Sequence, residues 1–291
     1  MMKKIGIIGG SGLYQLEGIE HVQDVTIVDT PFGQPSDHFM VGVLKGVEVV
    51  FLARHGRGHR ISPSQINYRA NIFEMKRLGV DAIISVSACG SLKEGIKPMD
   101  FVVPDQFIDR TNRGREASFF TDGIVAHVSL AEPVSPELTA ILIDSCKKAG
   151  ATVHGQGTYI NMEGPQFSTK AESRLYRSWG VDIIGMTNMV EAKLAREAEI
   201  AYATLAAVTD YDCWYEGHEE VTVEMIIQNL QKNVAKAKEI LRFAIPQAGK
   251  VEKFRDAEAL KNALITDSHM IPEQKKKELE VLIGKYLPAK V

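Results

Sequence analysis

Short runs of apolar, largely β-branched residues alternate with segments of helical periodicity along most of this 291-residue chain. The apolar runs are punctuated by Gly or Pro and predict strands at residues 3–8, 25–28, 39–44, 47–53 and 82–87. Helical spacing and end signals predict helices at residues 67–78 and 135–150. Further strands are predicted at 153–162, 181–186 and 200–208, and further helices from Thr169 and over 189–197. This alternation predicts an α/β fold.

The last third of the chain is helical in pattern. After Thr222 a long amphipathic helix is predicted, ending before Pro246, with one apolar stripe: Val223, Ile226, Ile227, Leu230, Val234, Ala237 and Leu241. Two shorter helices are expected near residues 257–264 and 272–286. Because no repeat, low-complexity tract or long Gly/Ser linker interrupts the chain, we expect one domain with a helical C-terminal tail.

Charge and cysteine content exclude several classes of protein. The 34 Lys and Arg against 37 Asp and Glu argue against a polyanion binder, so we expect no nucleic-acid partner. No run reaches about 18 apolar residues, so no membrane partner is expected. The opening run lacks the apolar core of a signal peptide. Cys89, Cys146 and Cys213 are odd in number and widely spaced, which fits neither disulfides nor a metal site and favours a cytoplasmic location.

A glycine-rich turn follows the first predicted strand. Gly9-Gly10-Ser11-Gly12 could hold a phosphate with backbone N–H groups and the Ser11 hydroxyl, but it could equally be an ordinary turn. The dinucleotide-binding fingerprint fails, since Gln15 stands where its third glycine belongs.

Two more strand ends carry groups suited to an anion. Arg54 offers a fork of donors that matches a phosphate, and His55 can add another. The run from Ser87 through Ala88 to Ser91 combines small hydroxyl and glycine residues. Taken singly, Arg54 could form a surface ion pair and His55 could be a structural imidazole. A metal site at His55 and His59 is weaker, because no third ligand lies at useful spacing.

The segment at 161–168 joins a strand end to a helix start through Gly-Pro. Phe167 could stack on a flat base, although core packing is the commoner role of a Phe. Glu163 and Met186 are both candidates to face a ribose.

Two carboxylates follow the last predicted strand, at Asp210 and Asp212. In an extended chain residues at i and i+2 point to one face, and two close acids in a buried cleft tend to share one proton. The pair can therefore protonate a ring nitrogen of a purine and accept from its exocyclic amine, whereas a 6-oxopurine would be mismatched. The alternative is a solvated acidic turn.

Six segments together resemble the S-methyl-5′-thioadenosine phosphorylases of the purine nucleoside phosphorylase family. They are GGSGL at 9–13, ARHGR at 53–57, ACGS at 88–91, EGPQFS at 163–168, MT at 186–187 and TDYDCW at 209–214. The resemblance spans about residues 3 to 246, and the last segment is similar to the adenine-selective branch. It implies a single-domain phosphorylase/hydrolase-like fold: a central mixed, twisted β-sheet flanked by helices, with residues 1–250 as catalytic domain. Residues 251–291 would be a helical extension that packs on the same domain or on a neighbouring subunit.

The same resemblance implies the activity and the site. The reaction would be phosphorolysis of S-methyl-5′-thioadenosine, with inorganic phosphate as co-substrate and no metal or organic cofactor. The catalytic residues would be Asp210 and Asp212, and the phosphate would be bound by Ser11, Arg54, His55, Ser87, Ala88 and Thr187. The ribose and base would contact Phe167, Ser168, Met186, Thr209, Asp210 and Asp212. The methylthio group would lie against Val221, Val223 and Ile226, with His127 contributed by a neighbouring subunit of a trimer or of a dimer of trimers.

Three alternatives stay open from the residues alone. The same loops could serve a nucleoside phosphorylase acting mainly on adenosine or on a 6-oxopurine nucleoside. They could serve a nucleosidase that uses water, or a non-catalytic nucleotide sensor.

Overall fold

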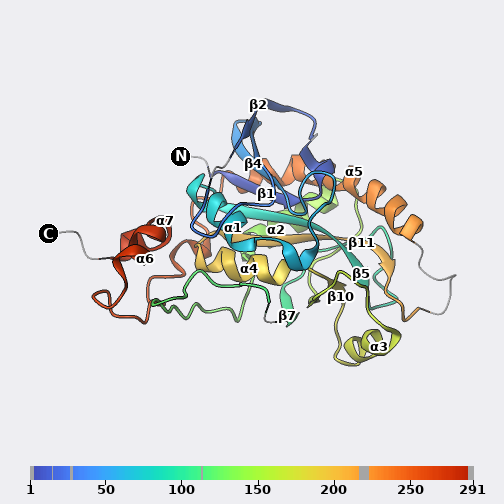
Figure 1. Cartoon of the computed structure of the whole chain (residues 1–291). Coiled ribbons are helices and arrows are strands. Elements are labelled where there is room, and N and C mark those ends of the chain that lie inside the picture. The colour runs from blue at the N-terminus through green and yellow to red at the C-terminus, as the bar shows by residue number, and fades with distance from the viewer. Residues whose placement is uncertain (1–2, 15, 27–28, 113, 216–222, 288–291) are drawn as a thin grey trace.

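The computed structural model describes residues 3–14, 16–26, 29–112, 114–215 and 223–287; for Ser11, Tyr14 and residues 223–227 it describes the backbone only (Figure 1). The strands of this part of the chain form one mixed sheet. They are β1 Ile5–Gly9, β2 Ile19–Val25, β3 Phe39–Leu44, β4 Val47–Ala53, β5 Ala82–Ser91, β6 Phe101–Val102, β7 Gln106–Arg110, β8 Val153–His154, β9 Thr158–Met162, β10 Ile183–Gly185 and β11 Ala201–Tyr211.

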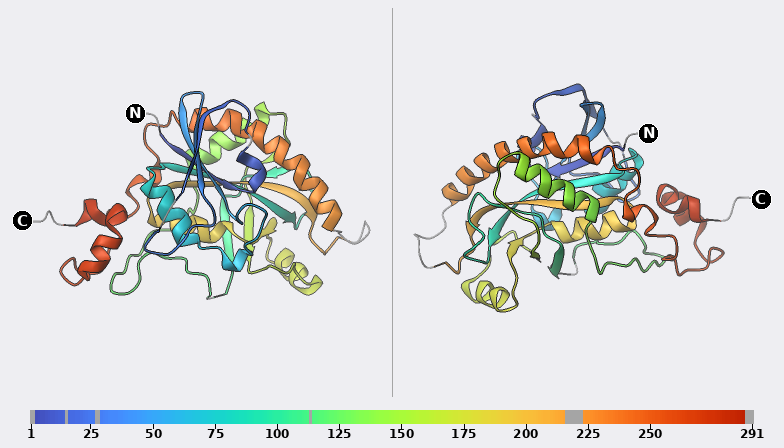
Figure 2. Two further views of the ribbon diagram at one scale, coloured as in Figure 1. Left: turned by 45° about the horizontal axis from the view of Figure 1, so that its top comes forward. Right: turned by 180° about the vertical axis from the view of Figure 1, so that it is seen from behind.

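Helices cover both faces of this sheet. The α-helices are α1 Tyr68–Arg77, α2 Pro136–Lys148, α3 Lys170–Ser178, α4 Asn188–Glu197, α5 Val223–Ala248, α6 Glu273–Glu278 and α7 Glu280–Ile283. Figure 2 shows α2 and α5 together on one side and α4 on the other. Successive residues of β1 divide between the layers, because Ile7 shares a buried cluster with Leu138 and Leu241 whereas Ile8 shares one with Ile72 and Leu194. Two covered faces explain the nearly continuous apolar strands, and the predicted α/β fold is confirmed.

The order of the strands leaves a gap in strand pairing at the centre of the sheet. The main path is β2-β3-β4-β1-β5-β10-β9-β7, and β11 pairs with β5. Strand β1 runs parallel to β5 and registers with residues 82–85, whereas β10 runs antiparallel and registers with Gly90 and Ser91. In the ladders of the described residues, positions 86–89 therefore have a partner only in β11. Ligands of open α/β sheets bind where neighbouring strands diverge in this way.

Several predicted boundaries differ from the structure. Residues 153–162 form two strands instead of one, because the chain turns at Gly155 and Gly157 and the two halves pair with different neighbours, β6 and β7. The strand predicted at 25–28 lies earlier, as the polar, exposed edge strand β2; residues 27 and 28 lie outside the described residues. Both strands that carry predicted site residues are longer than expected, since β5 continues to Ser91 and β11 to Tyr211.

Pro246 lies inside α5, where the prediction had the helix end before it. The helix continues to Ala248 because Ala244, Ile245 and Ala248 are fully buried in the core. This burial near the helix end outweighs the one backbone hydrogen bond that a proline removes.

The segment after residue 250 packs against the chain's own core. Leu260, Ile271, Leu282 and Ile283 belong to the same buried cluster as Leu194 of α4. Polar bonds reinforce the contact, because the Glu199 carboxylate accepts from Leu260 N at 3.0 Å. The helices here are shorter than predicted: a 3-10 turn at Arg255–Glu258, then α6, α7 and a final turn at Gly284–Tyr286.

Leu282→Ala should lower the free energy of unfolding by about 2–5 kcal/mol, because the side chain is 1% exposed and its loss leaves a cavity. Val281→Ala is a matched control: its neighbouring side chain is 37% exposed, so the change should stay within about 0.5 kcal/mol. Urea denaturation of both variants measures the difference. Equal effects would contradict the tail being part of the core.

No helix in the described residues has the length and apolar character needed to cross a bilayer.

Candidate active site

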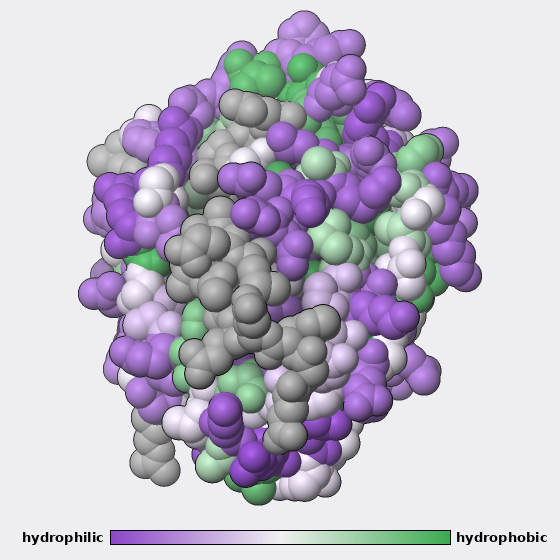
Figure 3. All heavy atoms as spheres, turned by 90° about the vertical axis from the view of Figure 1, so that its right-hand side faces the viewer, coloured by the Kyte–Doolittle hydropathy of each residue, from purple (hydrophilic) through white to green (hydrophobic). Residues whose placement is uncertain are grey.

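The carboxyl ends of β4, β1, β5 and β11 meet at one edge of the sheet, because these strands run parallel. The backbone N–H of Arg54 donates to Gly9 O at 3.0 Å, so the residues after β4 lie beside the glycine turn. Ser11 begins a 3-10 turn at Ser11–Tyr14, and its side chain lies outside the described atoms. Figure 3 shows this end of the molecule, where hydrophilic side chains surround small hydrophobic patches.

Arg54 is buried in an ion pair, not exposed in a surface pair. Its Nε donates to Glu191 Oε1 at 2.5 Å and its Nη2 to Glu191 Oε2 at 3.2 Å. Nη2 also donates to Ser85 Oγ at 2.6 Å, and Nη1 donates to Val86 O at 3.1 Å. Burial alone would lower the pKa of Arg54, but the Glu191 charge and its hydrogen bonds raise it. Glu191 thus occupies the bidentate side of the fork, and Nη1 keeps an N–H for an anion.

Arg54 packs against a buried polar network that the sequence did not predict. Asn188 Nδ2 lies 2.9 Å from Ser85 Oγ and 3.0 Å from Tyr202 Oη, and that tyrosine donates to Glu191 Oε2 at 2.9 Å. All four side chains are buried. Their positions in the sequence carry no local signal, because Glu191 and Arg54 are 137 residues apart and meet only when α4 packs on the sheet.

His55 lies next to this ion pair and is held by the backbone. Its Nδ1 donates to Ile61 O at 2.8 Å, and its ring stacks on His59 with 4.3 Å between the ring centroids. Burial, followed by the Arg54 charge, lowers the pKa of His55 to about 4. The imidazole is therefore neutral at pH 7, with Nδ1 protonated and Nε2 left as an acceptor. In the described residues no three His, Cys, Asp or Glu side chains gather closely enough to hold a metal ion.

Ser87 and Ala88 both lie within β5, whereas the prediction ended the strand at Ser87 and placed Ala88 in the turn after it. The strand continues because its residues pair with β11 as far as Ser91. The Ser87 hydroxyl is buried and has no hydrogen-bond partner among the described residues, whereas Ala88 is exposed. Thr187 is buried at the start of α4, and its hydroxyl makes no capping bond to the helix.

Asp210 lies near the end of β11 and Asp212 directly follows the strand, and both are close to Gly90 of β5. A Cβ at Gly90 would lie 3.1 Å from Ile184 Cγ2, 3.4 Å from Asp210 Oδ2 and 3.5 Å from Asp212 Cβ, so a side chain here would crowd Ile184 next to the two aspartates. Burial and, to a smaller extent, the Asp212 charge raise the pKa of Asp210 to about 6. A hydrogen bond from Thr209 Oγ1 at 2.6 Å acts in the opposite direction and lowers this pKa. Burial also raises the pKa of Asp212, whose Oδ2 is buried without a partner in the described residues.

The loop after β9 brings Ser168 and Phe167 to the same region. The hydroxyls of Ser173 and Ser168 oppose the rise of the Asp212 pKa, which ties Ser168 to that carboxyl. A Cβ at Gly164, where φ is 70°, would lie 2.5 Å from Met186 Sδ, so only glycine permits this close approach. Phe167 is 64% exposed, and the core-packing alternative for it is therefore wrong.

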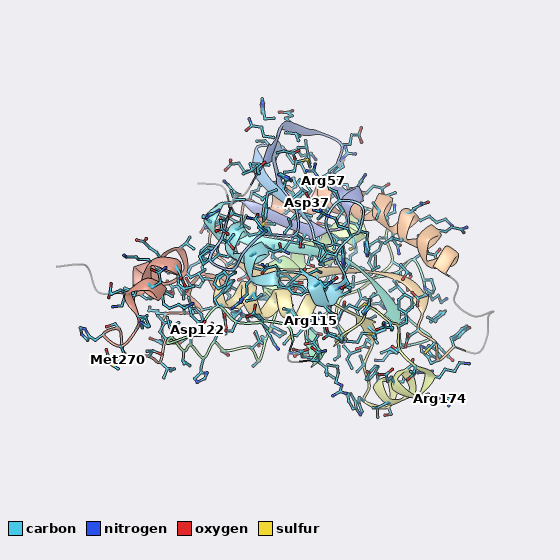
Figure 4. The ribbon with its side chains drawn as sticks, in the orientation of Figure 1. Asp37, Arg57, Arg115, Asp122, Arg174 and Met270 are labelled. Carbon is cyan, nitrogen blue, oxygen red and sulfur yellow. The ribbon has the colours of Figure 1, made fainter. Side chains whose placement is uncertain are left out.

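Glu163 does not extend a free carboxylate toward a ribose. Its Oε1 accepts from Arg115 Nε at 3.1 Å, and its Oε2 accepts from Asn112 N at 2.9 Å. The Arg115 side chain is 1% exposed and also donates to the backbone carbonyls of Met186 and Glu163. Figure 4 shows Arg115 near the middle of the molecule, far from Met270 in the tail. Arg115 thus joins two site loops, and no sequence signal indicated it.

Four further predicted residues are only partly accounted for. His127 is exposed, and its backbone N–H donates to Ala263 O at 2.8 Å. Val221 lies outside the described residues, and the side chains of Val223 and Ile226 are likewise not described.

The chain is similar in sequence and in fold to known proteins. The model of the Phosphorylase superfamily matches residues 4–246. S-methyl-5′-thioadenosine phosphorylase of Geobacter sulfurreducens is 56% identical over 99% of this chain and 100% of its own length. The crystal structure of a methylthioadenosine phosphorylase from an antarctic soil metagenomic library has a TM-score of 0.92 and 50% identity, covering 97% of this chain and 99% of that one.

A mutant adenosine/methylthioadenosine phosphorylase from Schistosoma mansoni, solved in complex with methylthioadenosine, is 38% identical with a TM-score of 0.81, covering 89% of this chain and 96% of that one. The sequence identity over the full length, the fold and the family model all indicate the same family. The chain therefore belongs to the S-methyl-5′-thioadenosine phosphorylase family of the phosphorylase superfamily.

Proposed function

We propose that this chain catalyses the phosphorolysis of S-methyl-5′-thioadenosine to adenine and 5-methylthio-α-D-ribose 1-phosphate. A phosphate oxygen attacks the anomeric carbon, the glycosidic C–N bond breaks, and its electron pair leaves with the base. The observation that carries the proposal is the pair of aspartates beside Gly90, of which Asp212 is buried and Asp210 is half-buried. Membership of the family supports it.

The aspartates act on the leaving adenine. Asp210, with a pKa of about 6, exchanges a proton near neutral pH and delivers it to a ring nitrogen, so that the base leaves neutral. Asp212 accepts from the exocyclic amine through its unpartnered Oδ2. Gly90, Phe167, Ser168 and Thr209 line the base, and Met186 contacts the ribose.

The phosphate binds where β1 and β10 diverge from β5. Arg54 supplies positive charge and the N–H on Nη1, and Ser11, Ser87 and Thr187 supply hydroxyls beside Ala88. His55 accepts a hydrogen bond at Nε2 from a protonated phosphate oxygen, since its Nδ1 donates to Ile61 O. The bound anion is both the nucleophile and a negative charge near the cation that develops on the sugar. Phosphate is a co-substrate, and the reaction uses no metal or organic cofactor.

Substrate choice and assembly complete the proposal. An apolar pocket of Val221, Val223 and Ile226 receives the methylthio group, and His127 reaches the site of a neighbouring subunit in a trimer or a dimer of trimers. The exposure of His127 is compatible with such a role. Apolar pockets discriminate by only about 1–3 kcal/mol, so adenosine should be a poorer second substrate. Reduced, unpaired Cys89, Cys146 and Cys213 agree with a cytoplasmic location.

The proposal is tested by incubating purified protein with methylthioadenosine, with and without inorganic phosphate, and following adenine and the sugar product. We expect adenine release that requires phosphate, slower release from adenosine, and none from inosine. Release without phosphate would make the chain a hydrolase. No release from any nucleoside would favour a binding protein, and cleavage of inosine would contradict the assignment of Asp212.

A further inference from the structure

Tyr159 of β9 carries a hydroxyl that the proposed reaction does not use. The side chain is 0% exposed, and its oxygen has no hydrogen-bond partner among the described residues. A buried hydroxyl left unsatisfied costs about 1–3 kcal/mol, so each such group in a folded protein calls for an explanation.

Gly185 determines where this hydroxyl lies. In the parallel register of β9 and β10, Tyr159 pairs with Ile183, and Gly185 stands two residues further along the same face. A Cβ on Gly185 would overlap the Tyr159 Oη atom, so the ring can cross β10 only because this residue has no side chain. Beyond β10 lies β5, and Tyr159 shares a buried cluster with Cys89 of that strand.

Ser87 is the β5 residue whose hydroxyl acts on Tyr159. Ser87 stands two residues before Cys89, on the same face of the strand. Its oxygen is also buried without a partner in the described residues. Burial raises the pKa of Tyr159, while the Arg54 charge and the Ser87 hydroxyl oppose that rise. Two unsatisfied hydroxyls thus lie together at the edge of the phosphate site.

We propose that Tyr159 is a positioning residue for phosphate: when phosphate binds, its O–H donates to Ser87 Oγ, so that the single hydroxyl hydrogen of Ser87 is directed at the bound phosphate. A serine hydroxyl has one hydrogen and two lone pairs, and a donor at one lone pair restricts where the hydrogen can point. Tyr159 therefore acts through Ser87 and does not contact the substrate. The inference rests on the proposed function, in which Ser87 binds phosphate.

Three variants test this by calorimetric titration with inorganic phosphate alone, alongside the phosphate KM and the nucleoside KM. Tyr159→Phe removes only the hydroxyl and should weaken phosphate binding about 3- to 10-fold, with the nucleoside KM unchanged. Ser87→Ala should weaken phosphate binding at least as much. In the double variant, loss of the tyrosine hydroxyl should have no further effect, because its action needs the Ser87 oxygen.

Tyr286→Phe serves as the control, since it removes a tyrosine hydroxyl bonded to Glu199 in the tail, and phosphate binding should not change. Additive losses in the double variant, or normal phosphate affinity in Tyr159→Phe, would overturn the positioning role. Normal affinity in Ser87→Ala would instead refute the proposed phosphate site. Titration with phosphate alone keeps these outcomes separate from a failure to cleave methylthioadenosine.

Discussion

Replacing Asp210 by Asn is expected to reduce kcat for methylthioadenosine by about 10²–10⁴-fold, because the amide cannot deliver a proton to the leaving adenine. In the wild-type protein, kcat/KM should fall as pH rises above about 6, as the half-buried Asp210 carboxyl loses its proton. That dependence should be absent in the variant, while the dependence on phosphate ionisation remains. Steady-state kinetics at several pH values measure both.

Folding stability should not fall with this substitution. Burial holds the pKa of Asp210 above its unfolded value, so the native state retains a proton that the unfolded state loses between about pH 4 and pH 6. The carboxyl therefore destabilises the protein as pH rises through that range, by up to about 3 kcal/mol. Asp210→Asn removes this cost, and its Tm at pH 7 should equal or exceed that of the wild type.

Asp267→Asn is the matched control, since Asp267 is exposed in the tail and its loss should leave kcat unchanged. Turnover by Asp210→Asn within a few-fold of the wild-type value would contradict the role of Asp210 as general acid. A large fall in Tm would show that the activity was lost through unfolding.

Arg54→Ala is expected to lower the free energy of unfolding by about 3–5 kcal/mol, because Glu191 is left as a buried charge without its partner. The same variant should lose saturation of the rate by phosphate, since Arg54 supplies the positive charge at that site. Urea denaturation and rate measurements over a range of phosphate concentrations record the two effects.

A double substitution separates stability from function. Arg54→Met with Glu191→Leu replaces the buried pair by apolar side chains of similar volume, which is often neutral or stabilising. Stability should largely recover in this protein while phosphate saturation stays lost. If phosphate dependence returned together with stability, Arg54 would serve the fold alone.

Local patterns accounted for the elements of the fold. Helices α1, α2 and α4 were predicted to within a few residues, because apolar periodicity, a capping serine and a terminal glycine act over one or two turns. The length of β5 and β11 was underestimated, since Gly90 and Asp210 are poor strand residues that remain extended only because the two strands pair. Pro246 likewise stays helical through burial of its neighbours.

The sequence by itself determined an α/β chain with glycine and hydroxyl residues at its strand ends, two acids two positions apart, and the resemblance to the family. Only the tertiary structure decided that Arg54 pairs with Glu191, that Arg115 holds Glu163, and that Tyr159 crosses Gly185 toward β5. The physical reason is the range of the interactions. Periodicity, capping and turn formation act between residues a few positions apart, whereas these contacts join residues up to 137 positions apart and exist only once strand register and helix packing are fixed.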